Sequence, residues 1–518
     1  MKKLKLIGNI LLLAFYMLLI TSCKKGTTYF IFPDGDDNNP GNSEKFAWQT
    51  FKAANKHHFK PGDKILLKGG ALFEGQLKID GDDRSSKEYP ILISSTDTIP
   101  AIIHAGDSSG LLIENIGNII IKNLKIEGNG ASSKNHGCGI AVVNTLNGNK
   151  KLHNIRIENI QASGFARQIN EGPLGIQHPA GCGIFVGGFP EDGSKSGYHN
   201  VLINHCNTFE NQYYGMLITG YWQDNPDKGN YANHNTSIEN CNFWSNFGDS
   251  TYIENHSGSG ILLEDVDLGM IQHCKAWQNG QYCKSRAGGP CGIWTAVSNN
   301  VTIQYCESYD NRTSYHDGCG FDLDGGCTNN LLQYNYSHDN DGAGFLIYTY
   351  NGAPHADSSN VVRYNISEND SKNNPHHAPL RIGNSGSGMK HLEVYDNIFL
   401  NKGCAPELIR ISGNDIQAKL NDNLFIADAK IPFIIKEKSN SSILFERNNF
   451  WSTKNQFSME WDGLEIMDIS RFNRLLNVEP GNFNSAKKLE GISLSNFEKY
   501  GSASHPKRLE AFSEKLDF

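Results

Sequence analysis

Short stretches in which apolar and polar residues alternate recur along the chain at intervals of about 30 residues. In one repeat, "NVLINHCNTFENQ" (200–212) contains a strand pattern, a polar bend and a second short strand, and "GMLIT" (215–219) follows as a third strand. The same order starts again near residues 118, 154, 235, 300, 330 and 360. Alternation with a period of two residues predicts strands, and three short strands per repeat predict one coil of a parallel β-helix. An antiparallel sandwich is the alternative, but it would have hairpin turns instead of residues that match column by column.

The coils, together with the chain that precedes them, resemble bacterial right-handed parallel β-helix proteins of the pectate-lyase-like superfamily over roughly residues 27–455. The sequence therefore predicts an all-β fold, with a right-handed parallel β-helix of about ten or eleven coils over residues 61–460. Residues 23–60 are expected to form a tether and an N-terminal cap, with an amphipathic helix near 46–57 over the open end of the coil. Residues 461–518 lose the repeat and are expected to form a C-terminal cap or tail. The resemblance is informative about the fold and leaves the activity open.

Cysteines occupy two recurring positions of the repeat, which supports stacked coils. The first column contains Cys206, Cys241, Cys274 and Cys306 and continues with Asn335, and the second contains Cys138, Cys182, Cys291 and Cys319. Equivalent residues of successive coils lie about 4.8 Å apart, so the first column is expected to be a buried ladder of small side chains. Metal-binding thiolates are the alternative, but the sequence contains no CxxC pair. Parallel side-chain directions also disfavour disulfides between coils.

The first residues predict export. Lysines at positions 2, 3 and 5 precede a mostly apolar stretch over residues 6–20, and the small residues before Cys23 resemble a bacterial lipobox. That resemblance implies that residues 1–22 are a lipoprotein signal peptide and that Cys23 carries a lipid. The protein is then expected on the bacterial envelope, at the periplasmic or surface face of the outer membrane, and in contact with membrane only through this anchor. An ordinary signal peptide or an uncleaved anchor is the alternative. The net charge of −8, without a Lys/Arg-rich run, argues against nucleic acid as a partner.

Side chains of each third strand are expected to alternate between the core and the outer surface. The residue after the strand glycine should point inward and the next one outward. The two outward columns then bring together Glu264, Trp294, Asp322, Asp324, Tyr348, Arg381 and Arg410. Aromatic rings beside carboxylates and arginines suit a sugar polymer, because apolar ring faces stack and acidic groups bind cations. We therefore predict a functional groove on this face, with an ordinary solvated sheet face as the alternative.

The loops before three successive third strands add further candidates. They supply His316 and Asp317, then His338 and Asp341, then His376 and His377. With "HDGCGFDLDGG" (316–326) and "YNYSHDNDGAGF" (334–345), these coils resemble family 9 polysaccharide lyases. The resemblance implies a calcium ion, Ca²⁺, with Asp317, Asp322, Asp324 and Asp341 as its ligands. The lysine base of that family has no counterpart here, so the base would be a histidine or Arg381, although arginine rarely loses its proton.

Three functions fit these residues. The main prediction is a polysaccharide lyase that performs β-elimination on a uronate-containing glycan. The alternatives are an inverting glycoside hydrolase that uses Asp322 and Asp324, about 7 Å apart on one strand, and a non-catalytic glycan-binding lipoprotein. The catalytic candidates are Asp322, Asp324, Arg381, His316 and His338, and the substrate-binding candidates are Glu264, Trp294, Tyr348, Arg410, His376 and His377. The protein is expected to be a monomer with a polysaccharide as its partner.

Overall fold

The computed structural model describes residues 26–130, 137–167, 180–221, 229–427, 430–452, 454, 456–476 and 482–484. The predicted signal peptide and Cys23 lie outside the described residues. Within the described part of the chain, no helix is long and apolar enough to cross a membrane.

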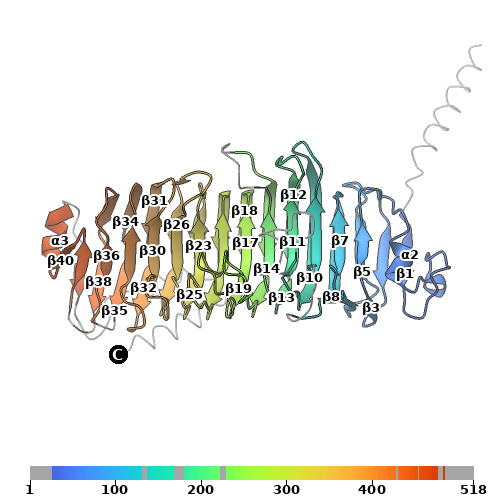
Figure 1. The fold of residues 1–518 in the computed structure, drawn as a ribbon, viewed down its shortest axis with the longest axis horizontal. Coiled ribbons are helices and arrows are strands. Elements are labelled where there is room, and N and C mark those ends of the chain that lie inside the picture. Colours follow the sequence, from blue (N-terminus) through green and yellow to red (C-terminus); the bar gives the residue numbers. More distant parts are fainter. Residues whose placement is uncertain are drawn as a thin grey trace, which may run out of the picture.

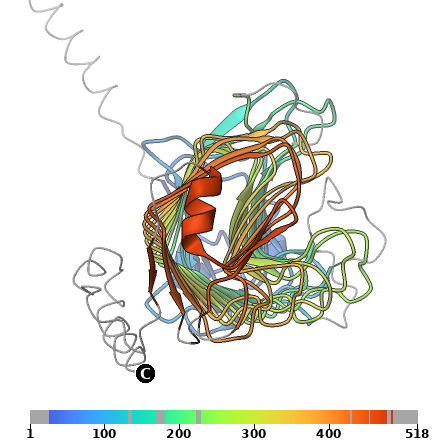
Figure 2. The same cartoon turned by 90° about the vertical axis from the view of Figure 1, so that its left-hand side faces the viewer.

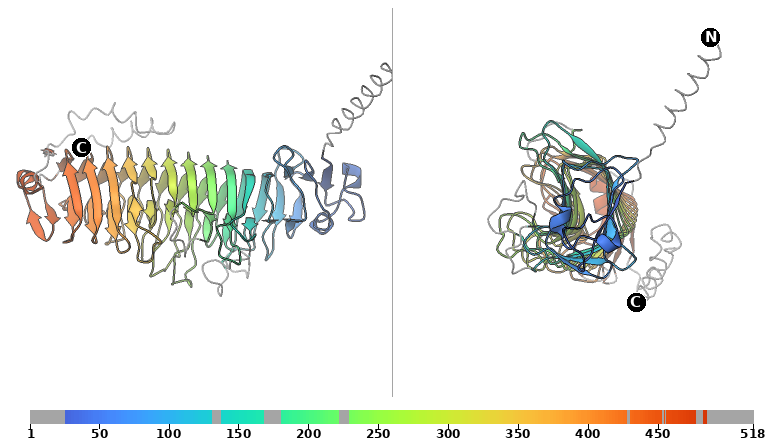
Figure 3. Two further views of the ribbon diagram at one scale, coloured as in Figure 1. Left: turned by 90° about the horizontal axis from the view of Figure 1, so that it is seen from above. Right: turned by 90° about the vertical axis from the view of Figure 1, so that its right-hand side faces the viewer.

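Strands of successive coils lie side by side along the long axis of the molecule (Figures 1 and 3), and the prediction of an all-β parallel β-helix is confirmed. One coil runs through β12 (Gly197–Asn204), β13 (Asn207–Phe209) and β14 (Tyr214–Thr219), and each strand pairs in parallel with its counterpart in the next coil. The first two strands of a coil belong to a 27-stranded sheet and the third belongs to a 14-stranded sheet.

The 14-stranded sheet contains the third strands that the glycine pattern predicted. Its members in order are β4 (Leu77–Ile79), β7 (Leu111–Glu114), β9 (Ile140–Asn144), β11 (Cys182–Gly188), β14, β17 (Ser259–Glu264), β20 (Cys291–Ala296), β23 (Cys319–Asp324), β26 (Phe345–Thr349), β30 (Leu380–Asn384), β33 (Ile409–Ser412), β36 (Ile434–Lys436), β39 (Met459–Trp461) and β40 (Leu464–Ile466). Only β40 pairs antiparallel among these described strands, so thirteen parallel strands follow one another, against the ten or eleven coils expected.

The 27-stranded sheet forms the other two sides of the coil. Its remaining members are β1 (Thr28–Ile31), β2 (Lys64–Leu67), β3 (Leu72–Glu74), β5 (Ile91–Ser95), β6 (Ala101–His104), β8 (Ile119–Glu127), β10 (Lys151–Ser163), β15 (Asn233–Glu239), β16 (Asn242–Trp244), β18 (Val266–Gln272), β19 (Lys275–Trp277), β21 (Asn299–Gln304), β22 (Glu307–Tyr309), β24 (Leu331–Gln333), β25 (Tyr336–His338), β27 (Asp357–Ser358), β28 (Val361–Arg363), β29 (Ile366–Glu368), β31 (Met389–Tyr395), β32 (Ile398–Asn401), β34 (Ile416–Asn421), β35 (Leu424–Ala427), β37 (Ser442–Glu446), β38 (Asn449–Ser452) and β41 (Asn482–Asn484).

The interior of the coil is a stack of inward side chains. The residue after each strand glycine is fully buried in the main hydrophobic core, as predicted, and Phe321 stacks on Phe345 with ring centroids 5.3 Å apart. The first cysteine column is also buried in this core, and its members are Cys206, Cys241, Cys274 and Cys306. Each member follows a corner residue with positive φ, for example 54° at Tyr305. The column continues through Asn335, whose Nδ2 donates to the carbonyl of Ile303 at 2.9 Å and to Asn365 Oδ1 at 3.1 Å.

Both ends of the coil are covered by short helical segments. At the N-terminal end, the helix expected near 46–57 is limited to α2 (Phe51–Ala54), because Ala47 is extended and Trp48 bridges to Ile31. A short 3₁₀ turn, η1 (Glu44–Phe46), precedes it. At the other end, α3 (Ile469–Leu476) lies across the coil in Figure 2.

Candidate functional site

Loops cover the outer face of the 14-stranded sheet. Figure 2 shows these loops, in green and yellow, projecting from one side of the coil. Outward residues such as Phe185, Leu217 and Leu262 belong to a second hydrophobic cluster, packed against loop residues that include Tyr252 and Ala343. A solvated sheet face would not be expected to carry these outward leucines. They are buried here because the loops and the sheet form a second hydrophobic core. Trp294 is also in this cluster and is only 3% exposed, so it does not present the open aromatic platform expected of a substrate-binding residue.

Three carboxyl groups lie beneath these loops, one on β17 and two on β23, and β20 lies between these two strands. Glu264 of β17 accepts a hydrogen bond from Thr219 Oγ1 at 2.5 Å. Asp322 of β23 is 3% exposed, and its Oδ2 accepts from Cys291 Sγ at 3.6 Å. Its Oδ1 has no hydrogen-bond partner among the described residues. Asp324 is half-buried at the end of β23, and the Gly325 backbone N–H donates to its Oδ1 at 2.9 Å. The predicted alternation therefore places Asp322 and Asp324 on the outer side, but within a covered site.

Burial changes the acidity of these groups. It raises the pKa of Glu264 to about 8, although the Thr219 hydroxyl acts in the opposite direction. Burial also raises the pKa of Asp324 to about 7, and the negative charge of Asp317 adds to this effect. For Asp322, burial and the nearby Cys291 and Asp324 hold the pKa well above its usual range. All three groups therefore favour the neutral form more than ordinary carboxyls do.

The pKa of Asp317 is shifted in the opposite direction. Its Oδ1 lies 3.3 Å from His377 Nε2, and its Oδ2 accepts from the Gly289 backbone N–H at 2.6 Å. Burial alone would raise the pKa of Asp317, but His377 and Gly289 outweigh it and hold the pKa below its usual range. The side chain is 18% exposed. Asp317 is therefore an ionised carboxylate in electrostatic contact with Asp322 and Asp324, which have raised pKa values.

His377 was expected to bind substrate, but the structure places it against Asp317. It is only 7% exposed, and its Nδ1 lies 3.7 Å from Cys319 Sγ. His376 is exposed, with its backbone N–H donating to Asn374 Oδ1. The His316 ring packs edge-on against Tyr315 at 5.2 Å, and its charge when protonated favours the ionised form of Asp317.

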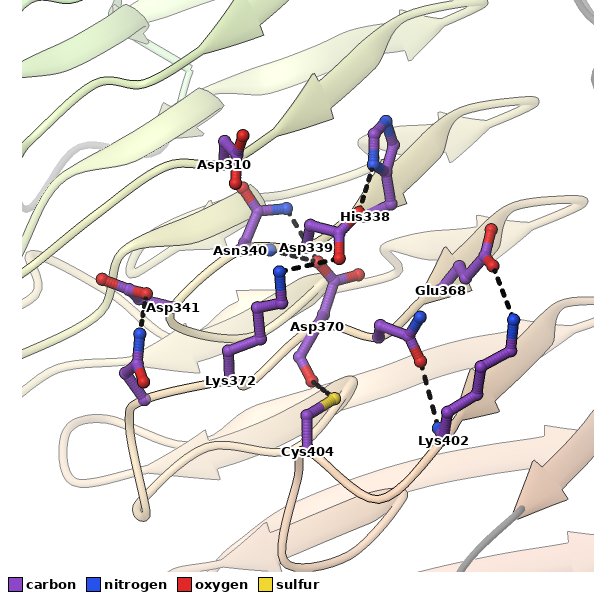
Figure 4. A network of polar contacts seen from close by, with 12 residues as sticks. Asp310, His338, Asp339, Asn340, Asp341, Glu368, Asp370, Lys372, Lys402 and Cys404 are labelled. Carbon is purple, nitrogen blue, oxygen red and sulfur yellow. Dashed lines mark hydrogen bonds and ion pairs between the residues drawn. The ribbon is translucent and has the colours of Figure 1, made fainter.

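His338 and Asp341 lie away from the three carboxyls, in the polar network of Figure 4. His338 belongs to β25 of the 27-stranded sheet, where Tyr309 stacks on its ring at 4.7 Å and Asp339 lies 2.9 Å from its Nδ1. The oxygens of Asp341 accept from the Thr313 backbone N–H at 3.1 Å and from Asn373 Nδ2 at 2.5 Å. The sequence pattern places His338 in the loop before a third strand. In the structure, His338 is instead the last residue of β25, which is the second strand of its coil.

The arginines of the outward columns are held by protein groups. Arg381 donates to the carbonyl of Ile382 at 2.9 Å and to Ser412 Oγ at 2.5 Å, and its guanidinium lies 5.8 Å from the ring centre of Tyr348. Arg410 is ion-paired with the buried Glu407. Neither side chain presents all of its donors to a ligand.

The predicted calcium ligands do not all converge. Asp317, Asp322 and Asp324 lie in one electrostatic cluster, whereas the oxygens of Asp341 are engaged elsewhere. Among the described residues, the group with metal-ligating atoms close together is Asp317, Cys319 and His377. A bound calcium ion therefore remains a prediction.

Sequence reasoning missed one buried histidine of this region. His256 lies in the loop before β17, where Tyr214 Oη is 2.8 Å from its Nδ1 and Trp294 lies edge-on at 5.0 Å. Burial lowers the pKa of His256 to about 4, so it is neutral at physiological pH. Aligning the loops coil by coil, in the way the strands were aligned, is the signal that identifies it.

Comparison with known proteins supports the fold. A family model described as "Right handed beta helix region" matches residues 174–361. A lacto-N-biosidase of Bifidobacterium longum subsp. longum is 22% identical over 544 residues, covering 87% of this chain and 32% of that protein. The chain thus spans about a third of that relative's length.

Solved structures give the same result. The GH136 lacto-N-biosidase of Eubacterium ramulus superposes with a TM-score of 0.57 at 20% identity, over 81% of this chain and 68% of that one. Pectate lyase Pel9A matches with a TM-score of 0.34 at 13% identity, over 79% of this chain and 80% of that one, and carries no argument about activity. At 20% identity, the superposition on the Eubacterium ramulus structure supports the fold alone.

Proposed function

We propose that this protein is a glycoside hydrolase whose reaction takes place at Asp317, Asp322 and Asp324. The observation that carries the proposal is a pair of partly exposed carboxyl groups with pKa values displaced in opposite directions. His377 and Gly289 keep Asp317 ionised, whereas burial keeps Asp324 protonated up to about pH 7. Two carboxyls separated in this way can serve as base or nucleophile and as acid in glycoside cleavage.

In this proposal Asp324 is the general acid that protonates the leaving oxygen. Asp317 is the carboxylate that activates water or attacks the sugar carbon. The pair predicted from sequence, Asp322 and Asp324, has a spacing of about 7 Å on one strand, which also suits an inverting enzyme. However, Asp322 is 3% exposed, whereas 18% of the Asp317 side chain is accessible. We therefore give Asp322 the role of a neutral neighbour that tunes the other two.

The lacto-N-biosidase relative supports a hydrolase over the lyase that was our main prediction. Arg410 points the same way. A lyase must neutralise the carboxylate of a uronic acid, yet the charge of Arg410 is already paired with the buried Glu407. A non-catalytic glycan-binding role does not require the opposed pKa values of Asp317 and Asp324.

The decisive experiment offers the purified protein a chromogenic lacto-N-bioside, a panel of other glycosides, and uronate polysaccharides with and without a chelator. We expect release of the chromophore or new reducing ends without an unsaturated product. Asp324→Asn and Asp317→Asn should each lower kcat by about 10²–10⁴-fold, while Asp82→Asn, at an exposed position near the N-terminal end, should not. The rate should fall as pH rises through about 7, where Asp324 loses its proton. An ultraviolet-absorbing unsaturated sugar would overturn the proposal in favour of a lyase, and glycan binding without any cleavage would favour a binding protein.

We also propose that the protein is exported and anchored to the envelope through a lipid on Cys23, as the N-terminal pattern predicts. Radiolabelled palmitate should enter the wild-type protein and not Cys23→Ser, and only the wild type should sediment with membranes. Equal labelling of both proteins would contradict this proposal.

A further inference from the structure

The N-terminal end of the coil, drawn in blue in Figure 3, contains an open cavity of about 980 Å³. Three parts of the chain line it: the first described residues, from Gly26, the loop before β2, and the loop before β5. The two loops contribute the cations Lys60 and Arg84, and the second loop also contributes Tyr89. This cavity lies in the first coils, away from the carboxyl groups of β17 and β23.

Two buried carboxylates hold the walls of this cavity in place. Asp63 accepts from the Thr27 backbone N–H at 2.7 Å through one oxygen and from the Lys60 backbone N–H at 2.8 Å through the other. Asp83 accepts from the Phe59 backbone N–H at 2.6 Å. The backbone around the cavity is therefore fixed before any ligand arrives, which lowers the entropy cost of binding.

The cations of the cavity are available to a ligand. Both Lys60 and Arg84 are exposed, and neither has an ion-pair partner among the described residues. By contrast, the neighbouring Lys68 is paired with Asp34 at 3.1 Å. Asp63 is already occupied by backbone donors, so the exposed Asp82 is the remaining acidic residue of the lining. An ammonium and a guanidinium around one cavity suit a phosphate group, which accepts charge-assisted hydrogen bonds from both.

The position of the cavity relative to the predicted anchor indicates where such a phosphate would come from. A Cβ on Gly26 would lie 1.9 Å from the carbonyl oxygen of Gly62, so the chain is pressed against the cavity wall at this point. Cys23 precedes Gly26 by three residues, with Lys24 and Lys25 between them. Three residues span at most about 11 Å. A lipid on Cys23 would therefore hold the cavity next to the headgroups of the bilayer.

We propose that this cavity binds the phosphate of an anionic phospholipid headgroup, with Lys60 and Arg84 as its donors. The inference rests on the lipid anchor proposed at Cys23. Tyr89, which lines the cavity and is 41% exposed, is a residue type that is enriched at the level of the headgroups. The headgroup site is then a second attachment to the same bilayer, beside the acyl chains.

Attachment through the end of the column directs the stack of coils away from the bilayer. In the 14-stranded sheet, seven strand-to-strand steps separate β4 from β23. At about 4.8 Å for each step, the carboxyl groups of the candidate site lie about 34 Å along the column. A membrane-attached end would thus leave the candidate site accessible to glycans in the surrounding solution.

Hydrogen exchange of the full protein in lipid nanodiscs tests the headgroup site. Amides of residues 58–63 and 82–89 should exchange more slowly in discs that contain phosphatidylglycerol than in discs of phosphatidylcholine alone, whereas β23 should not differ. The double variant Lys60→Gln, Arg84→Gln should lose this difference. Lys56→Gln with Lys87→Gln removes the same charge from exposed positions outside the lining and is the matched control. Equal exchange in both kinds of disc, or an equal loss in the control, would overturn the proposal.

Soluble probes separate the headgroup site from the lipid anchor and from a site for free phosphate. Glycerophosphoglycerol, added to the detergent-purified protein without a bilayer, should slow exchange in the same two loops. Lys60→Gln and Arg84→Gln should each weaken its binding about 5-fold. Inorganic phosphate that protects the loops equally well and abolishes the phosphatidylglycerol effect would show a phosphate site and overturn the lipid assignment. Protection by glycerophosphoglycerol in a protein that incorporates no palmitate would refute the anchor alone, and palmitate incorporation without any protection would refute the headgroup site alone.

Discussion

At the scale of single residues, environment rather than residue type separates the roles of the acidic groups. Asp317 and Asp324 have the same side chain, yet one accepts from Gly289 and faces His377, and the other is held by burial and a single backbone N–H. The first arrangement favours a charge and the second a proton. This separation has a consequence for stability that can be measured without substrate.

The folded protein binds the Asp324 proton more tightly than the unfolded chain does, because folding raises the pKa from 3.8 to about 7. The stabilisation from this proton is complete below about pH 4 and is lost as pH rises through 7. Asp324→Asn should therefore match the wild type in urea unfolding at pH 4. At pH 8 it should be more stable, on the order of 1–3 kcal/mol after solvent screening. Asp82→Asn serves as the control at both values, and a variant less stable than wild type at pH 8 would contradict the buried state of Asp324.

The sequence was sufficient to place Asp322 and Asp324 on the outer side of one strand, because a period of two residues leaves no other choice once Phe321 is inside. It was not sufficient to show their burial. That depends on loops such as the one carrying His256, whose paths follow no local periodicity. His377 was found as a candidate, but its role depends on contact with Cys319 and Asp317, which lie 58 residues or more away in sequence.

At the scale of elements, the coil corners change chemistry midway along the stack. From Cys206 to Cys306 the corner position holds a thiol, which makes weak contacts, such as Cys306 Sγ to the carbonyl of Ile271 at 3.7 Å. From Asn335 onward it holds asparagine, whose amide satisfies backbone groups of two coils. The asparagine half should therefore depend more on each corner residue than the cysteine half does.

Replacing Asn365 tests this difference. Its Oδ1 accepts from the Asn335 backbone N–H at 3.0 Å, and its Nδ2 donates to the carbonyl of Leu332 at 2.8 Å. Asn365→Ala leaves both buried backbone groups unpaired and should cost on the order of 2–3 kcal/mol. Cys274→Ala removes a small apolar group and should cost about 1 kcal/mol. If both variants unfold at the same urea concentration, the amide ladder is not a major source of stability.

Element boundaries show where sequence patterns were reliable. Third strands were located correctly because strict alternation marks them, together with a preceding glycine in most coils, as at Gly215 and Gly320. The N-terminal helix was predicted too long, because the apolar spacing at Trp48 and Phe51 also fits a chain that first bridges to Ile31 and only then turns. Predicting which spacing prevails requires the partner strand, which the local sequence does not contain.

At the scale of the whole molecule, the stack behaves as a column in which each coil contacts its neighbours. The candidate site lies midway along this column, around β17 to β26. The C-terminal end is closed by α3, where Phe472 is buried against Trp461 at 5.2 Å and Phe445 at 5.7 Å. Because interactions in such a column pass from neighbour to neighbour, damage at the end should remain local.

Phe472→Ala should therefore destabilise the last coils without affecting the site. Removing a buried phenylalanine ring costs about 3–5 kcal/mol, which should accelerate amide hydrogen exchange in β37 to β39. Exchange in β23, and any activity that depends on Asp317 and Asp324, should remain at wild-type levels. Leu475→Ala is the matched control, because Leu475 lies on the same helix and is 50% exposed. Faster exchange that extends through β23 in Phe472→Ala would show instead that the column unfolds as one cooperative unit, and that the end cap contributes to the stability of the candidate site.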